Sequence, residues 1–148
     1  MTKERKLIYL ISTAQHLIKN EMIGRFKHGG LAITPTHSTI LFLLEKDGPL
    51  QMSEIGKTLY IENSTVTGLI DRLEAKGFVS RLPAEEDRRK WIIAITERGR
   101  DEIDAARNVI RLLNSDIGKG YSQKELDTLE NILCGLIVRF SGQEESTP

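Results

Sequence analysis

The spacing of hydrophobic residues changes from helical to strand-like at Gly77, and this change limits the folds open to the chain. Before it, the apolar residues at positions 66, 69, 70 and 73 lie within about 100° of arc on one side of a helix. After it, residues 78–82 and 91–95 are rich in β-forming side chains and flank the polar stretch 83–90. The sequence therefore predicts a helix that a glycine terminates, followed by a β-hairpin with a charged tip.

Helical spacing and capping residues predict further helices on both sides of this segment. They span about residues 3–26, 35–45, 96–117 and 122–140, and a short one begins at Ser53. Asn63 is predicted to be the N-cap of the helix that precedes the hairpin. Two short helices joined by residues 60–62 and followed by a hairpin are typical of a winged helix-turn-helix, in which the hairpin is the wing.

Apolar stripes mark the helices at both ends of the chain. They run through residues 7–18, 103–117 and 126–140 at spacings of three and four. Packing within the chain is one explanation, but three long helices exceed what one small winged unit can cover. We therefore predict dimerisation helices at about residues 3–28 and 100–141, flanking a winged helix-turn-helix at about residues 31–99. The expected fold is mainly α with a small β-wing, in a single unit of residues 1–148.

The sequence argues against several classes of protein. No apolar run approaches the roughly 20 residues needed to cross a bilayer, and no cleavage site follows the apolar residues 7–11. A single cysteine, Cys134, cannot build an internal disulfide framework. No phosphate-binding glycine loop, nucleophile elbow or helical His-Glu-x-x-His occurs, and the three histidines lack metal-ligand spacing. We expect a cytoplasmic protein without membrane contact, enzymatic activity, metal or cofactor.

The net charge of zero weighs slightly against nucleic-acid binding, because proteins that neutralise phosphates usually carry a basic surplus. The charge is, however, unevenly distributed. Residues 1–50 carry seven basic and four acidic side chains, whereas residues 101–148 carry five and nine. A basic surface away from the C-terminal end is therefore compatible with the composition, and residues 88–90 are the candidate for it.

The outer face of the helix that begins near Asn63 is small and polar. Opposite its apolar row lie Ser64, Gly68, Asp71 and Ala75, and Thr65, Thr67 and Arg72 flank them. Small side chains allow close approach to base edges, and hydroxyl groups can contact bases or phosphates. Asp71 has two interpretations, acceptance from a cytosine amino group or pairing with a nearby basic residue. The alternative for the whole face is the solvated side of an ordinary amphipathic helix.

The tip of the predicted hairpin combines Asp87 with the basic residues Arg88, Arg89 and Lys90. A neighbouring carboxylate can hold an arginine extended toward a narrow minor groove. A solvated turn is the alternative for such a charge run. A winged-helix module that docks protein instead of DNA is the alternative at the level of function, and retention on random duplex DNA at low salt distinguishes the two.

Residues 87–99 read Asp-Arg-Arg-Lys-Trp-Ile-Ile-Ala-Ile-Thr-Glu-Arg-Gly. This stretch resembles the wing signature of the MarR family of bacterial transcription regulators, an Asp-x-Arg that leads into a strand and ends in Leu/Ile-Thr-x-x-Gly. Residues 33–35, 63–67 and 71–79 are similar to the family's second and recognition helices. The resemblance covers residues 33–99 by motif, whereas the outer helices match only in length and position.

The resemblance implies a homodimer that binds duplex DNA, and we expect a repressor that recognises an inverted repeat and is released by a small ligand. The DNA-binding residues that the resemblance implies are Ser64, Thr65, Thr67, Gly68 and Arg72 on the recognition helix, with Asp87 and Arg89 on the wing. We also expect Arg88 and Lys90 on the wing, and Ser53 on the preceding helix, to contact DNA. Arg89 would enter the minor groove with Asp87 orienting it. Small aromatic ligands of the family bind between the dimer helices and the winged domain, which makes His16 and His37 candidate ligand contacts.

The histidines and the cysteine also have plainer interpretations. We expect His16, His28 and His37 to be polar residues of the surface or of a cleft. Cys134 lies beside the apolar stripe of the last helix, where the prediction is a buried structural thiol and the alternative is a redox sensor.

Overall fold

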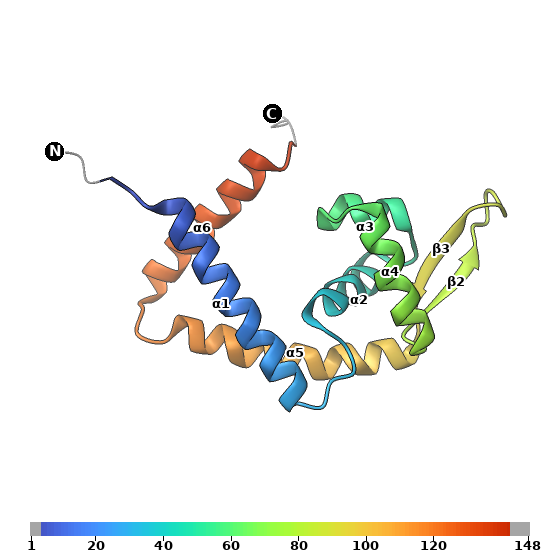
Figure 1. The fold of residues 1–148 in the computed structure, drawn as a ribbon, viewed down its shortest axis with the longest axis horizontal. Coiled ribbons are helices and arrows are strands. Elements are labelled where there is room, and N and C mark those ends of the chain that lie inside the picture. The colour runs from blue at the N-terminus through green and yellow to red at the C-terminus, as the bar shows by residue number, and fades with distance from the viewer. Residues whose placement is uncertain (1–3, 143–148) are drawn as a thin grey trace. The chain divides into compact units, whose positions relative to one another are not determined.

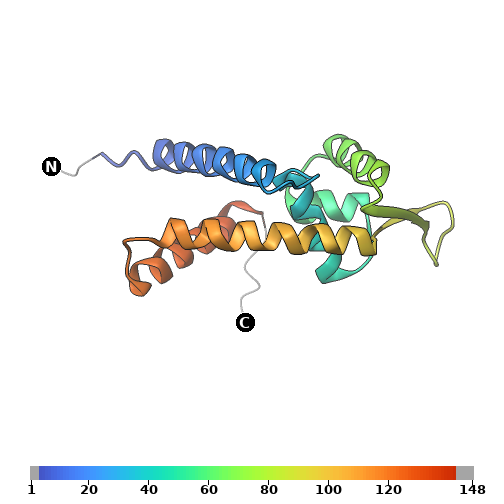
Figure 2. The same ribbon diagram turned by 90° about the horizontal axis from the view of Figure 1, so that it is seen from below.

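The computed structural model describes residues 4–142 of the chain. The elements in chain order are α1 (Leu7–His28), α2 (Pro35–Asp47), β1 (Leu50–Gln51), α3 (Met52–Leu59), α4 (Asn63–Ala75), β2 (Val79–Pro83), β3 (Trp91–Ile95), α5 (Glu97–Gly118) and α6 (Gln123–Phe140) (Figure 1). Backbone contacts divide the chain into two compact units, residues 1–111 and 112–148. The boundary lies within α5, which is a continuous helix (Figure 2). The predicted mainly α fold with a small β-wing is confirmed.

The sheet has three antiparallel strands in the order β1-β3-β2. β2 and β3 form the predicted hairpin, with Val79 opposite Ile95 and Pro83 opposite Trp91. β1 adds two residue pairs on the other side of β3, Leu50 with Ile93 and Gln51 with Ile92. The sequence did not predict β1, because two residues are too few to show the alternation by which a strand is detected.

The hydrophobic core of the first unit is built from α2, α3, α4 and the sheet, with contributions from α1 and α5. Its fully buried side chains are Phe26, Ile40, Leu41, Leu44, Ile55, Val66, Ile70, Leu73, Phe78, Ile93 and Ile103. Burying a side chain of this size stabilises the folded state by about 1.5–3 kcal/mol. The apolar row predicted for α4 therefore faces this core, and the opposite face of α4 is left to solvent.

The ends of α4 agree with the sequence at one terminus and differ at the other. Gly77 follows the helix with φ of +77°, as predicted for a residue that ends a helix in the left-handed conformation. The predicted N-cap at Asn63 is wrong by one residue, since Glu62 occupies the N-cap and Asn63 is the first helical residue. The carbonyl of Asn63 instead accepts a hydrogen bond from the hydroxyl of Thr67.

The second unit contains the end of α5 and the whole of α6, whose N-cap is Ser122. None of the side chains of α6 is buried in the single chain, and Ile132, Leu133, Ile137 and Phe140 are among its exposed apolar residues. Cys134 is exposed as well. The predicted burial of this thiol is therefore wrong for the single chain, in which no side chain of this helix is buried. Among the described residues, no helix is both long and apolar enough to cross a membrane.

Candidate nucleic-acid interface

The turn between α3 and α4 is set by a close backbone approach and one left-handed residue. The amide of Ile61 donates to the carbonyl oxygen of Gly56 over 2.9 Å, and Tyr60 between them has φ of +56°. A Cβ atom on Gly56 would lie 2.7 Å from the carbonyl oxygen of Ile61, which is closer than real Cβ atoms approach. Glycine at position 56 is therefore required for this turn, and the turn fixes the start of α4 relative to α3.

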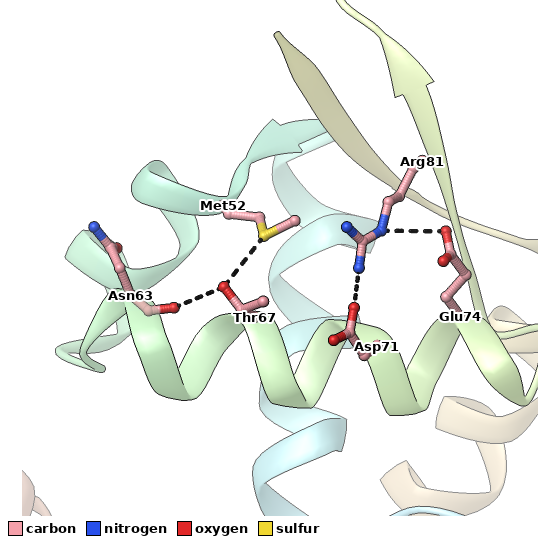
Figure 3. Close-up of polar contacts among 6 residues, drawn as sticks. All are labelled: Met52, Asn63, Thr67, Asp71, Glu74 and Arg81. Carbon is pink, nitrogen blue, oxygen red and sulfur yellow. Dashed lines mark hydrogen bonds and ion pairs between the residues drawn. The ribbon is translucent and has the colours of Figure 1, made fainter.

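The exposed face of α4 carries the residues that the sequence assigned to DNA contact. Ser64, Thr65, Thr67, Gly68 and Arg72 are all exposed. The hydroxyl of Thr67 donates to the carbonyl oxygen of Asn63 at 3.0 Å and lies 3.9 Å from the sulfur of Met52 (Figure 3). Because a hydroxyl has one hydrogen, Thr67 has only its oxygen lone pairs left for an external group. Ser64 and Thr65 form no such contact among the described residues.

A shallow recess beside the turn adds residues from α3. It is lined by Ser53, Gly56, Lys57, Tyr60, Ile61, Glu62 and Asn63. Ser53 is exposed here, which places this predicted site residue next to the start of α4. Lys57 and Tyr60 were missed by the sequence interpretation. The only signal for Lys57 was its position one turn after Ser53, and the only signal for Tyr60 was its position directly after α3.

Asp71 on α4 is paired with a basic residue of the wing. The guanidinium of Arg81 on β2 donates through Nη2 to Oδ1 of Asp71, and its Nε lies 3.3 Å from Oε2 of Glu74 (Figure 3). The Nε contact is an ion pair without the alignment of a hydrogen bond. Of the two interpretations of Asp71, pairing within the protein is the one that the structure bears out. Arg81 was not among the predicted site residues.

The wing tip holds Asp87 and Arg89 together, as the sequence predicted. Oδ1 of Asp87 accepts from the backbone amide of Arg89 at 3.0 Å and from its Nε at 3.1 Å, and Oδ2 lies 3.4 Å from Nη2. These bonds, first from the side chain and then from the backbone of Arg89, hold the pKa of Asp87 below its ordinary value. The Arg89 side chain is nevertheless 91% exposed, and Arg88 and Lys90 are exposed beside it. The tip thus presents three exposed cations beside the exposed carboxylates of Glu85 and Glu86, and the carboxylate of Asp87 orients Arg89.

The two histidines proposed as ligand contacts lie in different environments. His16 is exposed on α1 and its Nε2 lies 3.1 Å from the side-chain amide nitrogen of Asn20. His37 is only 5% exposed, so a place on the surface is wrong, whereas its place beside a ligand cleft stays a prediction. The backbone amide of Thr34 donates to its Nδ1 at 3.2 Å, and its own amide donates to the Thr34 hydroxyl at 3.3 Å. His37 therefore completes the capping box of α2.

Burial lowers the pKa of His37 most strongly, and the charges of Lys76 and Arg72 lower it further. The neutral imidazole that results accepts at Nδ1, which leaves its proton on Nε2. That nitrogen is buried and has no hydrogen-bond partner among the described residues. No cluster of three or more metal-ligating side chains occurs in residues 4–142.

Comparison with known proteins gives this geometry a family context. The MarR family profile matches residues 33–91. The chain is 31% identical to the HTH-type transcriptional regulator SarZ of Staphylococcus epidermidis, over 91% of this chain and 88% of the relative. It is 30% identical to the HTH-type transcriptional repressor YetL of Bacillus subtilis, over 85% of this chain and 73% of the relative.

Solved structures show the same fold. A MarR family transcriptional regulator from Streptomyces coelicolor has a TM-score of 0.78 and 28% identity, covering 94% of this chain and 96% of its own. The transcriptional repressor CouR, solved bound to a 23-mer DNA duplex, has a TM-score of 0.80 and 23% identity over 90% of this chain and 99% of its own. SarZ matches this chain over most of the length of both proteins. The family profile falls on the segment from α2 to the start of β3, which carries the candidate interface. The chain therefore belongs to the MarR family of transcriptional regulators.

Proposed function

We propose that this protein is a cytoplasmic repressor that binds duplex DNA as a homodimer, with α4 in the major groove and the wing tip at the neighbouring minor groove. The observation that carries the proposal is the wing tip, where Asp87 holds an arginine whose side chain is 91% exposed. An arginine fixed in this way meets the enhanced negative potential of a narrow minor groove. Repression rather than activation is supported by the relative YetL, which is named a transcriptional repressor.

Within this proposal the exposed residues divide into two roles. Ser64, Thr65, Gly68 and Arg72 on α4 contact base edges or nearby phosphates, and Thr67 contributes as an acceptor. Ser53 on α3, with Arg88 and Lys90 on the wing, meets phosphates. Substitution of Ser64 or Thr65 by alanine then changes base preference more than overall affinity.

The homodimer is supported by apolar side chains left uncovered in both parts of the chain. Leu7, Leu10 and Leu17 on α1 are exposed, as are Leu129 and Ile137 on α6. Exposed apolar area of this extent is typical of a surface that another chain covers. Terminal helices at about residues 3–28 and 100–141 would form the dimer, around winged lobes at about residues 31–99. Two recognition helices would then read half-sites of an inverted repeat roughly 34–36 Å apart.

The proposal includes release of the DNA by a small aromatic ligand. His37 has one buried donor, Nε2, without a partner in the described chain, and it lies near the cations Arg72 and Lys76. Among the described residues, the imidazole of His16 contacts only Asn20, which lies on the same helix. A screen of phenolic compounds against melting temperature and DNA affinity tests the idea. No change in either quantity would count against it.

The decisive test uses sedimentation and DNA binding together. At micromolar concentration the protein is expected to sediment as a dimer, and at low salt to be retained on random duplex DNA. Selection of bound fragments from genomic DNA is then expected to yield an inverted repeat. A folded monomer would overturn the dimer, and lack of retention on DNA would favour a protein-docking winged helix, which the net charge of zero allows.

A further inference from the structure

The exposed face of α4 carries two carboxylates, which is unfavourable for a surface that meets phosphates. Asp71 lies three residues after Gly68 and seven after Ser64, so it shares their side of the helix. Glu74 follows one turn later. Both carboxylates are exposed. Within the Debye length of about 10 Å at 0.1 M salt, such charges repel DNA unless a cation neutralises them.

Arg81 is the cation placed to do this. It comes from β2 and lies between the two carboxylates, donating to Asp71 and pairing with Glu74 at 3.3 Å (Figure 3). Its side chain is only 26% exposed, and its Nε is buried. The guanidinium is therefore directed toward the two carboxylates of α4 rather than toward an external phosphate.

Because both carboxylates are exposed to solvent, these ion pairs contribute little to folding stability, so stability does not account for a guanidinium shared by two carboxylates. Their electrostatic effect on a nearby polyanion is different, because every duplex phosphate adds to it. With Arg81 present, the three side chains sum to one negative charge. Without it, they sum to two, on the face that meets DNA.

We propose that Arg81 is a positioning residue for DNA binding, which neutralises Asp71 and Glu74 on the recognition helix so that this face can approach phosphates. The proposal rests on the proposed placement of α4 in the major groove. Arg81 acts through the two carboxylates and does not itself contact DNA.

The test compares charge variants on a labelled duplex of one fixed random sequence, by fluorescence anisotropy at low salt. Arg81→Gln is expected to raise Kd roughly three- to ten-fold, and the difference is expected to shrink as salt screens the carboxylates. The triple variant Arg81→Gln, Asp71→Asn, Glu74→Gln lacks the ion pairs but carries no local charge. It is expected to bind at least as tightly as the native protein.

The matched control is Arg107→Gln. Arg107 is also paired with two carboxylates, Glu45 at 2.8 Å and Asp104 at 3.7 Å, but neither lies on α4. This variant loses the same charge and is expected to change Kd less than two-fold. If it weakened binding as much as Arg81→Gln, the effect would be one of net charge alone and the proposal would fail.

A second variant keeps the proposal testable should Arg81→Gln not fold. The double variant Asp71→Asn, Glu74→Gln retains Arg81 and is expected to bind more tightly than the native protein, because the local charge becomes positive. The proposal is overturned if the triple variant binds as weakly as Arg81→Gln, or if the double variant binds more weakly than the native protein. Absence of binding by the native protein would instead overturn the proposed function, on which this inference depends.

Discussion

Two arginine–aspartate pairs of the winged unit have the same chemistry and opposite exposure. Arg81 pairs with Asp71 between β2 and α4, and its side chain is 26% exposed. Arg89 pairs with Asp87 within the wing tip, and its side chain is 91% exposed. The first carboxylate belongs to another element, whereas the second lies two residues away in the same turn.

The difference shows that a salt bridge alone does not reveal which partner serves the other. At the junction the arginine is enclosed, so the pair removes a negative charge from the surface of α4. At the tip the arginine is open, and the carboxylate is left 30% exposed, so the pair presents a positive charge in a fixed direction. The following predictions test this distinction.

The largest effect is expected for Arg89→Ala. Loss of the minor-groove contact should raise Kd about 10- to 100-fold on good and poor sites alike, because the contact reads shape more than sequence. The slope of log affinity against log salt should fall in magnitude by about one. Salt titrations followed by anisotropy measure both quantities. An unchanged slope would mean that the tip is a solvated turn. The Kd of Arg89→Lys, which keeps the charge without the planar fork, should lie between those of the native protein and Arg89→Ala.

A smaller loss is expected for Asp87→Ala. Arg89 would lose its orienting bonds, so Kd should rise roughly two- to five-fold even though a negative charge is removed. Glu86→Ala is the matched control, since it removes the same charge from the same tip. Glu86 is exposed and forms no hydrogen bond or ion pair within residues 4–142. Tighter binding by both variants would show that charge, and not orientation, governs the tip.

Stability is expected to change little when the junction pair is broken. Arg81→Gln should lower the free energy of unfolding by less than about 1 kcal/mol, because its partners are exposed and the pair is screened by solvent. Urea denaturation measures this quantity. A loss of several kcal/mol would mean that Arg81 serves mainly to hold the wing against α4. Arg81 would then differ from Arg89 in stabilising the fold, and not in neutralising carboxylates for DNA binding.

The smallest expected effect is a change in the free energy of unfolding with pH, which we assign to His37 and not to the arginine–aspartate pair of the wing tip. The lowered pKa of Asp87 keeps the tip pair ionised at any pH above the ordinary range of a carboxyl. The pKa of His37 is lowered by burial, then by Lys76 and Arg72, so the folded state binds fewer protons there than the unfolded state. The contribution of neutral His37 to the free energy of unfolding is therefore fully present above pH 6.5, near the pKa of His37 in the unfolded state. It is lost as the pH falls from there toward the lower pKa of His37 in the folded state.

Urea denaturation at about pH 8 and about pH 5.5 should thus show a lower free energy of unfolding at the acidic value. His37→Gln is the control, because glutamine can complete the capping box without titrating. It should reduce the difference between the two conditions. An equal pH dependence in both proteins would assign the effect to the exposed histidines.

Local patterns predicted the elements of this fold better than they predicted its contacts. The helix and strand periods and Gly77 located α4 and the hairpin, because these signals depend on neighbouring residues alone. β1 was missed since its two residues pair with β3 across about 40 positions of sequence, and no local pattern encodes such a pairing. The N-cap was placed one residue late because Asn63 is a favoured cap type, whereas the turn geometry gave the position to Glu62.

The candidate site followed the same division. The Asp87–Arg89 contact was predictable because it spans two residues, and the resemblance to a family wing reinforced it. The partner of Asp71 was predicted only as a class, since Arg81 reaches it from another element. The environments of His37 and Cys134 were wrongly predicted for one shared reason. Burial depends on which faces pack together, and the amphipathic pattern does not say whether a face is covered by this chain.

The strand order β1-β3-β2 also bears on aggregation. β3 is an uncharged, β-rich segment, the type that pairs with other chains when its edge is free. In this fold β2 pairs with β3 along its length, and β1 occupies the other edge at Ile92 and Ile93. The outer strand β2 carries Arg81 and ends at Pro83, and charges and prolines on an edge discourage further pairing. The segment most prone to self-association is thus kept at the centre of the sheet, and opening of the wing would be the step that exposes it.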